Sequence, residues 1–106
     1  ILMNNAQHRK PVRIIVVDDS HFIRQLFATR LGEDPMIEVV ATAEDAFRAR
    51  ELIKEHNPDM ITLDIEMPGM TGLDFARELM FNTLPPSVIF CTAFEQIRYQ
   101  QRTQCQ

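Results

Sequence analysis

The chain has 106 residues, of which 45% are hydrophobic and 25% charged, the size and composition of one ordinary globular domain. Its net charge of -4 and its two lysines argue against direct nucleic-acid binding, because contacts to phosphate backbones need clustered Lys and Arg. The apolar runs are too short to span a bilayer, and two cysteines without a CxxC motif predict no disulfide framework, so we expect a cytoplasmic protein.

The first half of the chain alternates strand and helix patterns. Residues 1–12 are polar and predict a disordered N-terminal arm. Ile14–Val17 is a β-branched run, typical of a strand buried on both faces of a parallel sheet. Apolar residues then recur at helical spacing from Phe22 to Leu31, and Ser20 is the expected cap of that helix. Ile37–Thr42 predicts a second strand. Glu44–His56 predicts a second helix, whose expected inward residues are Ala46, Phe47, Ala49, Leu52 and Ile53.

The second half repeats the alternation twice. Met60–Leu63 predicts a third strand that delivers Asp64 at its carboxyl end, followed by turn residues at 67–69. Gly72–Met80 predicts a third helix, with one face formed by Ala76, Leu79 and Met80. Val88–Cys91 predicts a fourth strand that ends at Thr92. The alternation predicts an α/β fold with an open parallel sheet, and the glutamine-rich tail at 95–106 does not fit it.

Acidic residues follow two of the predicted strands. Asp18 and Asp19 come after the first strand, Asp64 ends the third, and the hydroxyl of Thr92 follows the fourth. Because ligands of open α/β sheets bind at the carboxyl ends of the strands, we expect these side chains to meet in one pocket. Clustered carboxylates repel, and Mg²⁺ relieves that repulsion. For any single aspartate, helix capping or a strand end explains it equally well; the three together favour a metal site.

Three segments carry a family resemblance: residues 14–20, 57–74 and 88–93. They resemble the signature segments of response-regulator receiver domains of the CheY-like superfamily. The resemblance covers residues 13–94 and implies a flavodoxin-like, three-layer open parallel sheet with strand order 2-1-3-4-5. It also implies membership of a two-component phosphorelay. Residues 34–43 and 57–76 are similar to receivers of the chemotaxis methylesterase, whereas residues 85–94 are more similar to receivers of LytTR-type regulators.

The resemblance implies a role for each site residue. Asp64 would be the phospho-acceptor, and the metal would be held by Asp18, Asp19, Asp64 and the backbone carbonyl of Glu66. Asp19 would be a direct Mg²⁺ ligand, and Asp18 would act largely through water. Thr92 would be the switch hydroxyl that reaches the phosphoryl group. The donor would be a phosphohistidine on a sensor histidine kinase or a phosphotransfer protein, so we expect no enzyme beyond a receiver that promotes its own phosphotransfer.

The sequence departs from the family at its C-terminal end. No lysine follows Lys54, so the catalytic lysine of the family has no candidate, and no fifth strand or final helix is recognisable. We therefore expect a receiver truncated after its fourth strand, with an exposed edge that favours a homodimer. The alternative function is a non-signalling scaffold or an engineered fragment. A dehalogenase-like phosphatase would need an Asp-x-Asp motif after the first strand, where this chain has Asp18-Asp19-Ser20.

Overall fold

The computed structural model describes residues 10–67, 69–82 and 84–91. It contains seven elements in alternation: β1 (Val12–Val17), α2 (His21–Gly32), β2 (Ile37–Ala43), α3 (Ala46–His56), β3 (Met60–Asp64), α4 (Gly72–Leu79) and β4 (Ser87–Cys91). Every predicted strand and helix is therefore confirmed. Most of the expected N-terminal arm, the glutamine-rich tail and Thr92 lie outside the described residues.

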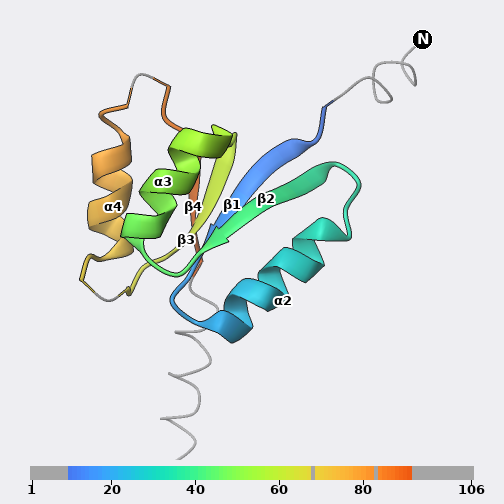
Figure 1. The fold of residues 1–106 in the computed structure, drawn as a ribbon, viewed down its shortest axis with the longest axis horizontal. Helices are drawn as coiled ribbons and strands as arrows, with labels where there is room; N and C mark the ends of the chain where they lie inside the picture. Colours follow the sequence, from blue (N-terminus) through green and yellow to red (C-terminus); the bar gives the residue numbers. More distant parts are fainter. Residues whose placement is uncertain (1–9, 68, 83, 92–106) are drawn as a thin grey trace, which may run out of the picture.

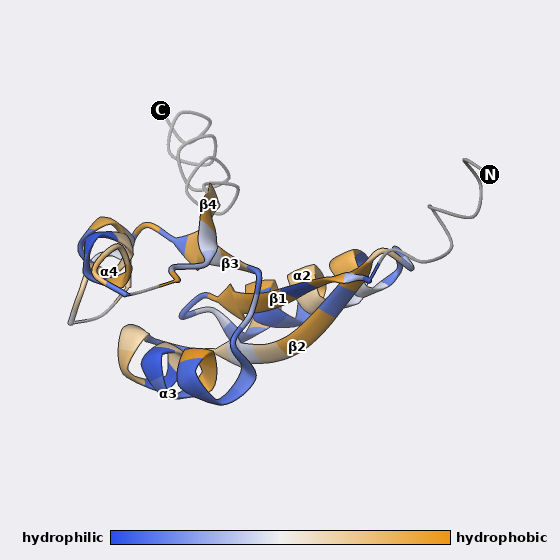
Figure 2. Ribbon diagram, turned by 90° about the horizontal axis from the view of Figure 1, so that it is seen from above, coloured by the Kyte–Doolittle hydropathy of each residue, from blue (hydrophilic) through white to orange (hydrophobic). Residues whose placement is uncertain are grey.

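The described strands form one parallel sheet in the order β2-β1-β3-β4 (Figure 1). This order confirms the expected flavodoxin-like topology as far as the fourth strand. Helix α2 lies on one face of the sheet and α3 on the other, which Figure 2 shows from above. Within the described residues, no helix is long and apolar enough to cross a membrane.

Local sequence signals fix the helix ends. The Ser20 hydroxyl accepts from the Ile23 backbone N–H at 3.2 Å, which confirms Ser20 as the cap of α2. Asn57 ends α3 in the left-handed region, at φ 49°, and its N–H donates to the carbonyl of Ile53. These caps satisfy backbone groups that a helix end would otherwise leave unpaired.

Two predicted inward residues face solvent instead. Phe47 is 71% exposed, because it lies one residue, and so about 100° of helix rotation, from the buried Ala46. Met80 is 75% exposed because α4 ends one residue before it. The inward stripe of α4 is formed by Gly72, Phe75 and Leu79, of which the sequence pattern predicts only Leu79.

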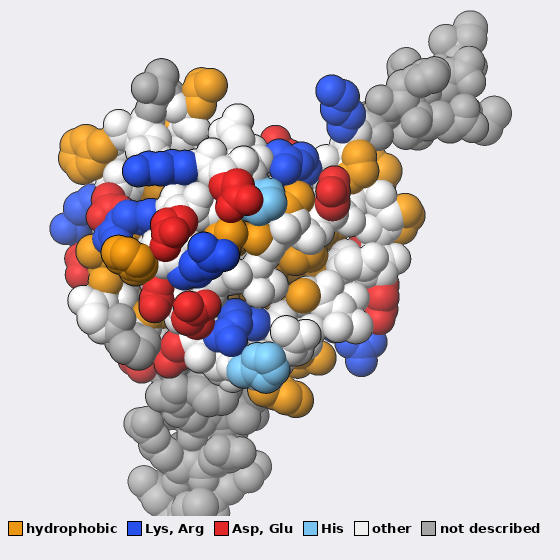
Figure 3. Space-filling view, in the orientation of Figure 1, with side chains coloured by type: hydrophobic (Ala, Val, Ile, Leu, Met, Phe, Trp, Pro, Cys, Tyr) orange, Lys and Arg blue, Asp and Glu red, His pale blue; other side chains and the backbone are white. Residues whose placement is uncertain are grey.

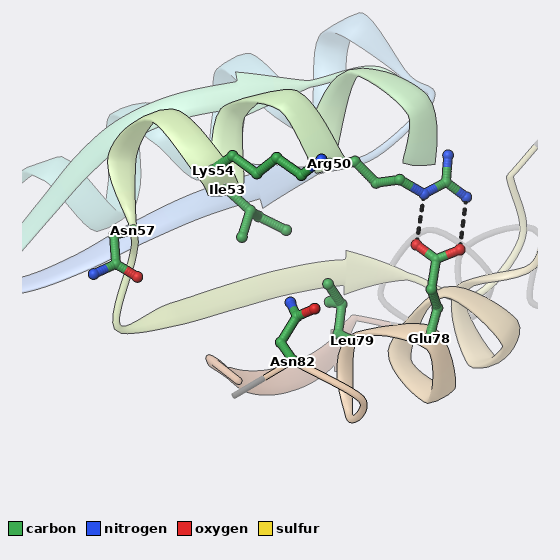
Figure 4. Close-up of a pocket in the computed structure, with 7 residues that line it drawn as sticks. All are labelled: Arg50, Ile53, Lys54, Asn57, Glu78, Leu79 and Asn82. Carbon is green, nitrogen blue, oxygen red and sulfur yellow. Dashed lines mark hydrogen bonds and ion pairs between the residues drawn. The ribbon is translucent and has the colours of Figure 1, made fainter. Parts of the chain in front are cut away.

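The main core lies between the sheet and the α3–α4 layer. Phe75 is fully buried there, between residues of β1, β3 and α3. Arg50 of α3 forms a bidentate ion pair with Glu78 of α4, with N–O distances of 2.5 and 2.9 Å (Figure 4). The Arg50 guanidinium also lies 5.7 Å from the centre of the Phe75 ring. Arg50 thus links the two helices above this core.

Candidate functional site

The three predicted aspartates meet at one end of the sheet. Asp18 directly follows β1 and Asp64 ends β3, and these strands are neighbours in which Val17 pairs with Leu63. One carboxylate oxygen from each of Asp18, Asp19 and Asp64 lies within 4.8 Å of the other two. Asp18 and Asp64 are each only 3% exposed, whereas Asp19 is exposed. We call this cluster the carboxylate triad.

The triad concentrates negative charge where water is largely excluded. Burial is the main cause that raises the pKa of Asp64 to about 7, and the neighbouring charge of Asp18 is the next. The pKa of Asp18 is also raised, first by burial. Among the described residues, none of the ion pairs includes a triad carboxylate. An oxygen cluster with uncompensated charge fits a hard divalent cation such as Mg²⁺.

Hydrogen bonds hold the turn that carries Asp18 and Asp19. The N–H of Asp18 donates to the carbonyl of Ala43 at 3.0 Å, which ties the turn to β2. The N–H of Ser20 donates to Oδ1 of Asp18 at 2.9 Å. Arg24 Nη1 donates to the carbonyl of Asp18 at 2.8 Å. Because Ser20 provides the helix cap, neither aspartate is needed for capping.

The segment after Asp64 returns close to the aspartate. The N–H of Glu66 lies 3.4 Å from Oδ1 of Asp64, and the N–H of Gly72 donates to the carbonyl of Ile65 at 2.6 Å. A Cβ at Gly72 would overlap the carbonyl oxygen of Asp64, so only glycine fits there. The sequence pattern predicts Gly72 as the first residue of a helix but does not indicate this contact. Gly69 turns the loop at φ 82°, as its turn residues predict.

The remaining predicted residues are placed as follows. Thr92 and Pro68 lie outside the described residues. Cys91, the last residue of β4, pairs in register with Asp64. It is half-buried, and burial followed by the charges of Asp18 and Asp64 raises the pKa of its thiol. His21 is exposed, and its Nδ1 lies 3.4 Å from Arg24 Nη2. In the described part of the chain, the triad is the one group of ligand atoms close enough to hold a metal.

A comparison with protein families matches residues 14–104 to the response regulator receiver domain. The chain belongs to this family. The receiver is 56% identical over 71 residues to a protein-glutamate methylesterase/protein-glutamine glutaminase of Bordetella avium, a match that covers 67% of this chain and 20% of that protein. A related protein of Saccharophagus degradans is 42% identical over 88 residues, covering 83% of this chain and 25% of that one. The chain therefore spans about a quarter or less of these relatives.

Solved structures of response regulator receiver domains resemble this chain as well. The receiver superimposes on the response regulator domain of Thermotoga maritima CheB with a TM-score of 0.71 and 37% identity, covering 76% of this chain and 60% of that one. It matches the receiver of the putative response regulator NarL of Mycobacterium tuberculosis with a TM-score of 0.72 and 36% identity, covering 77% and 66%. The resemblance to methylesterase receivers is confirmed by these relatives. The resemblance of residues 85–94 to LytTR-type receivers stays a prediction.

Proposed function

We propose that this receiver accepts a phosphoryl group on Asp64, with Mg²⁺ held by the carboxylate triad. The observation that carries the proposal is the convergence of Asp18, Asp19 and Asp64 within 4.8 Å, two of them buried. Membership of the receiver family supports the same assignment. The backbone carbonyl of Glu66, two residues after Asp64, would complete the protein's metal ligands.

In the proposed reaction, a carboxylate oxygen of Asp64 attacks the phosphorus of a phosphohistidine. A P–O bond forms, the P–N bond breaks, and the imidazole leaves and takes up a proton. Asp64 must be ionised to attack, and its raised pKa means that burial works against that state. Bound Mg²⁺ would supply positive charge that favours the ionised triad and balances charge on the transferring oxygens. Asp18 and Asp19 would hold it beside Asp64.

The proposed donor is a sensor histidine kinase or a phosphotransfer protein in the cytoplasm. The methylesterase relatives point to a chemotaxis pathway. Thr92, which follows Cys91 at the end of β4, is the proposed switch hydroxyl. Figure 3 supports a protein partner over nucleic acid for the face it shows, because acidic and basic side chains are interspersed there.

The test is phosphorylation by acetyl phosphate, followed by intact-mass spectrometry. We expect one phosphoryl group to be added in the presence of Mg²⁺ and none when Mg²⁺ is chelated. Asp64→Asn should abolish the adduct, whereas Asp74→Asn, which changes an exposed aspartate on α4, should not. A folded chain that binds Mg²⁺ but never forms the adduct would favour the non-signalling scaffold, the alternative that the lack of a lysine after Lys54 supports.

We also propose that two copies of the receiver associate through β4. Among the described strands, β4 pairs only with β3, so its other edge has no strand partner. Ile89 and Phe90 are 47% and 39% exposed and, as neighbours in a strand, point to opposite faces. Edge-to-edge pairing with a second β4 would place Ile89 and Phe90 beside their counterparts in the partner and would use the backbone groups that are unpaired among the described strands.

Light scattering over a dilution series tests this association. We expect a dimer that dissociates on dilution, and Ile89→Lys should shift the equilibrium to monomer because it places a charge at the joined edge. Lys substitution at the exposed Phe47, on α3 away from β4, is the control and should leave the dimer intact. A compact monomer at every concentration would contradict the proposal.

A further inference from the structure

Arg24 joins the first turn of α2 to the end of β1. Its backbone N–H donates to the carbonyl of the cap residue Ser20 at 3.0 Å, so it lies one turn into the helix. Its half-buried side chain reaches back, and Nη1 donates to the carbonyl oxygen of Asp18 at 2.8 Å. The second amino group, Nη2, lies 3.4 Å from Nδ1 of His21. The guanidinium therefore contacts the backbone of the triad and not its carboxylates.

The Asp18 carbonyl belongs to the peptide unit that precedes Asp19. Arg24 holds this peptide unit through its oxygen. The peptide unit that follows Asp19 is held through the Ser20 N–H, which donates to Oδ1 of Asp18 at 2.9 Å. Peptide units are planar, so the backbone around Asp19 changes only by rotation of these two planes. With both planes held, the Cα–Cβ direction of the exposed Asp19 is fixed relative to Asp64.

We propose that Arg24 is a positioning residue for the carboxylate triad: it holds the Asp18–Asp19 peptide so that the Asp19 carboxylate faces Asp64 in the geometry that binds a divalent cation. This inference rests on the proposed function, because the position of Asp19 matters only where a cation binds. Asp18 and Asp64 are buried and sit at the ends of paired strands, so they depend less on such a contact.

A purely electrostatic role for Arg24 predicts the opposite result. The positive charge of Arg24 favours the ionised form of Asp18, but it also repels a second cation in the pocket. At a pH at which the triad is fully ionised only the repulsion remains, so if charge were its whole effect on Mg²⁺, replacing Arg24 with a neutral side chain would tighten Mg²⁺ binding. If Arg24 positions Asp19, the same replacement weakens binding. The sign of the change therefore separates the two roles.

The experiment is a Mg²⁺ titration by calorimetry of the wild-type chain, Arg24→Met and Arg24→Lys. Met keeps the aliphatic stem and removes the donor and the charge, and we expect Mg²⁺ affinity to fall about fivefold, the value of one net hydrogen bond. Lys keeps a donor and should restore part of the loss. Arg48→Met is the matched control, because Arg48 is an exposed arginine paired with Glu51 on α3, and its affinity should equal that of the wild type.

Phosphorylation rates give a second readout that a general loss of stability would not produce. For Arg24→Met, the Mg²⁺ concentration for half-maximal rate should rise about fivefold, while the rate at saturating Mg²⁺ stays near the wild-type value. Should Arg24→Met not fold, the shorter and neutral Arg24→Gln carries the same expectation. Unchanged or tighter Mg²⁺ binding in the folded variant would overturn the inference and leave Asp64 phosphorylation standing. If the wild-type chain neither bound Mg²⁺ nor became phosphorylated, the proposed function itself would be refuted.

Discussion

The two faces of the sheet differ in how completely they are packed. The α3–α4 face carries a core cluster of twelve buried residues, to which α3 contributes four and α4 two. On the other face, α2 contributes a single buried residue, Ile23, although it also contains Phe22, Leu26, Phe27 and Leu31. A groove of about 570 Å³ runs there between α2 and β4, lined by Leu26, Phe27, Arg30, Leu31, Thr62, Ile89 and Cys91.

This difference separates what holds the fold from what remains available for contacts. The packed face fixes β1, β3 and α4, and these elements carry the triad and its neighbouring loop. The open face exposes apolar side chains over a continuous area, and such areas in proteins mark contact surfaces. The hydroxyl of Thr62, which lines the groove, is buried and has no hydrogen-bond partner among the described residues. We expect mutations on the two faces to differ accordingly.

The largest difference should appear when matched phenylalanines are truncated. Phe75→Ala removes a fully buried ring from the packed face and should lower the free energy of unfolding by about 3–5 kcal/mol. Phe27→Ala removes a ring that is only half-buried on the open face and should cost about 1 kcal/mol. Urea denaturation measures both. Equal losses would mean that the two faces are packed alike.

Glycine substitution tests the joint between the packed face and the site. Gly72→Ala introduces a Cβ that overlaps the carbonyl of Asp64, and we expect a loss of about 1–3 kcal/mol. Gly32→Ala, at the end of α2, meets nothing within 4 Å and should be neutral or slightly stabilising. Thermal melting of the pair is the measurement. A stable Gly72→Ala chain would show that α4 does not lie against the Asp64 carbonyl.

The pH dependence of the free energy of unfolding should show that the ionised form of Asp64 destabilises the fold. Between its unfolded pKa near 3.8 and its folded pKa of about 7, Asp64 binds a proton in the folded chain that the unfolded chain has released. Its contribution to the free energy of unfolding therefore falls as pH rises through this window and is constant above it. Without divalent cations, Asp64→Asn should remove that fall and be more stable than the wild type at pH 8.

Denaturation at pH 5 and pH 8 in chelator, for wild type, Asp64→Asn and the exposed control Asp74→Asn, measures this contribution. The difference between wild type and Asp64→Asn measures the titration of Asp64 together with its coupling to Asp18 and Asp19, since the carboxylates outside the triad titrate alike in both chains. If that difference did not change between the two pH values, the pKa of Asp64 would be close to its ordinary value.

The smallest effect should come from the ion pair above the packed core. The Arg50 and Glu78 side chains are 35% and 40% exposed, so we expect the pair to contribute about 0.5–1 kcal/mol. A double-mutant cycle with Arg50→Met and Glu78→Gln measures the coupling. The same cycle for Arg30 of α2 and its C-cap residue Glu33 should give almost no coupling, because their side chains are 72% and 60% exposed and the N–O distance is 3.9 Å. A larger coupling energy for Arg30–Glu33 than for Arg50–Glu78 would contradict this expectation.

The sequence predicted the elements well because strong local signals mark them. The β-branched run of β1 and the cap at Ser20 each act through the backbone of a few residues. The sequence also placed Asp18, Asp19 and Asp64 together, since parallel topology brings the ends of neighbouring strands to one edge. It predicted burial less well. Phe47 and Met80 are apolar but exposed, because helical phase and helix length decide which side chains face the core.

Contacts between one element and the strand end that precedes it were not predictable from the pattern. Nothing local to Arg24 indicates that it binds the Asp18 carbonyl, because the contact depends on how the turn orients α2. The close approach of Gly72 to Asp64 likewise depends on the packing of α4. Apolar residues at helical spacing predicted the helix α2. How far they are buried depends on which elements pack against α2, and only Ile23 is buried. Such features depend on three-dimensional packing and not on sequence spacing.

The central claim is that Asp64, within the triad, receives the phosphoryl group. The most direct measurement is reductive trapping: the chain is phosphorylated with Mg²⁺ and acetyl phosphate, the acyl phosphate is reduced with borohydride, and peptide sequencing by mass spectrometry locates the modified residue. An aspartyl phosphate is reduced to homoserine, and we predict this change at residue 64 alone. Homoserine at Asp18 or Asp19, or no conversion in a chain that binds Mg²⁺, would contradict the claim.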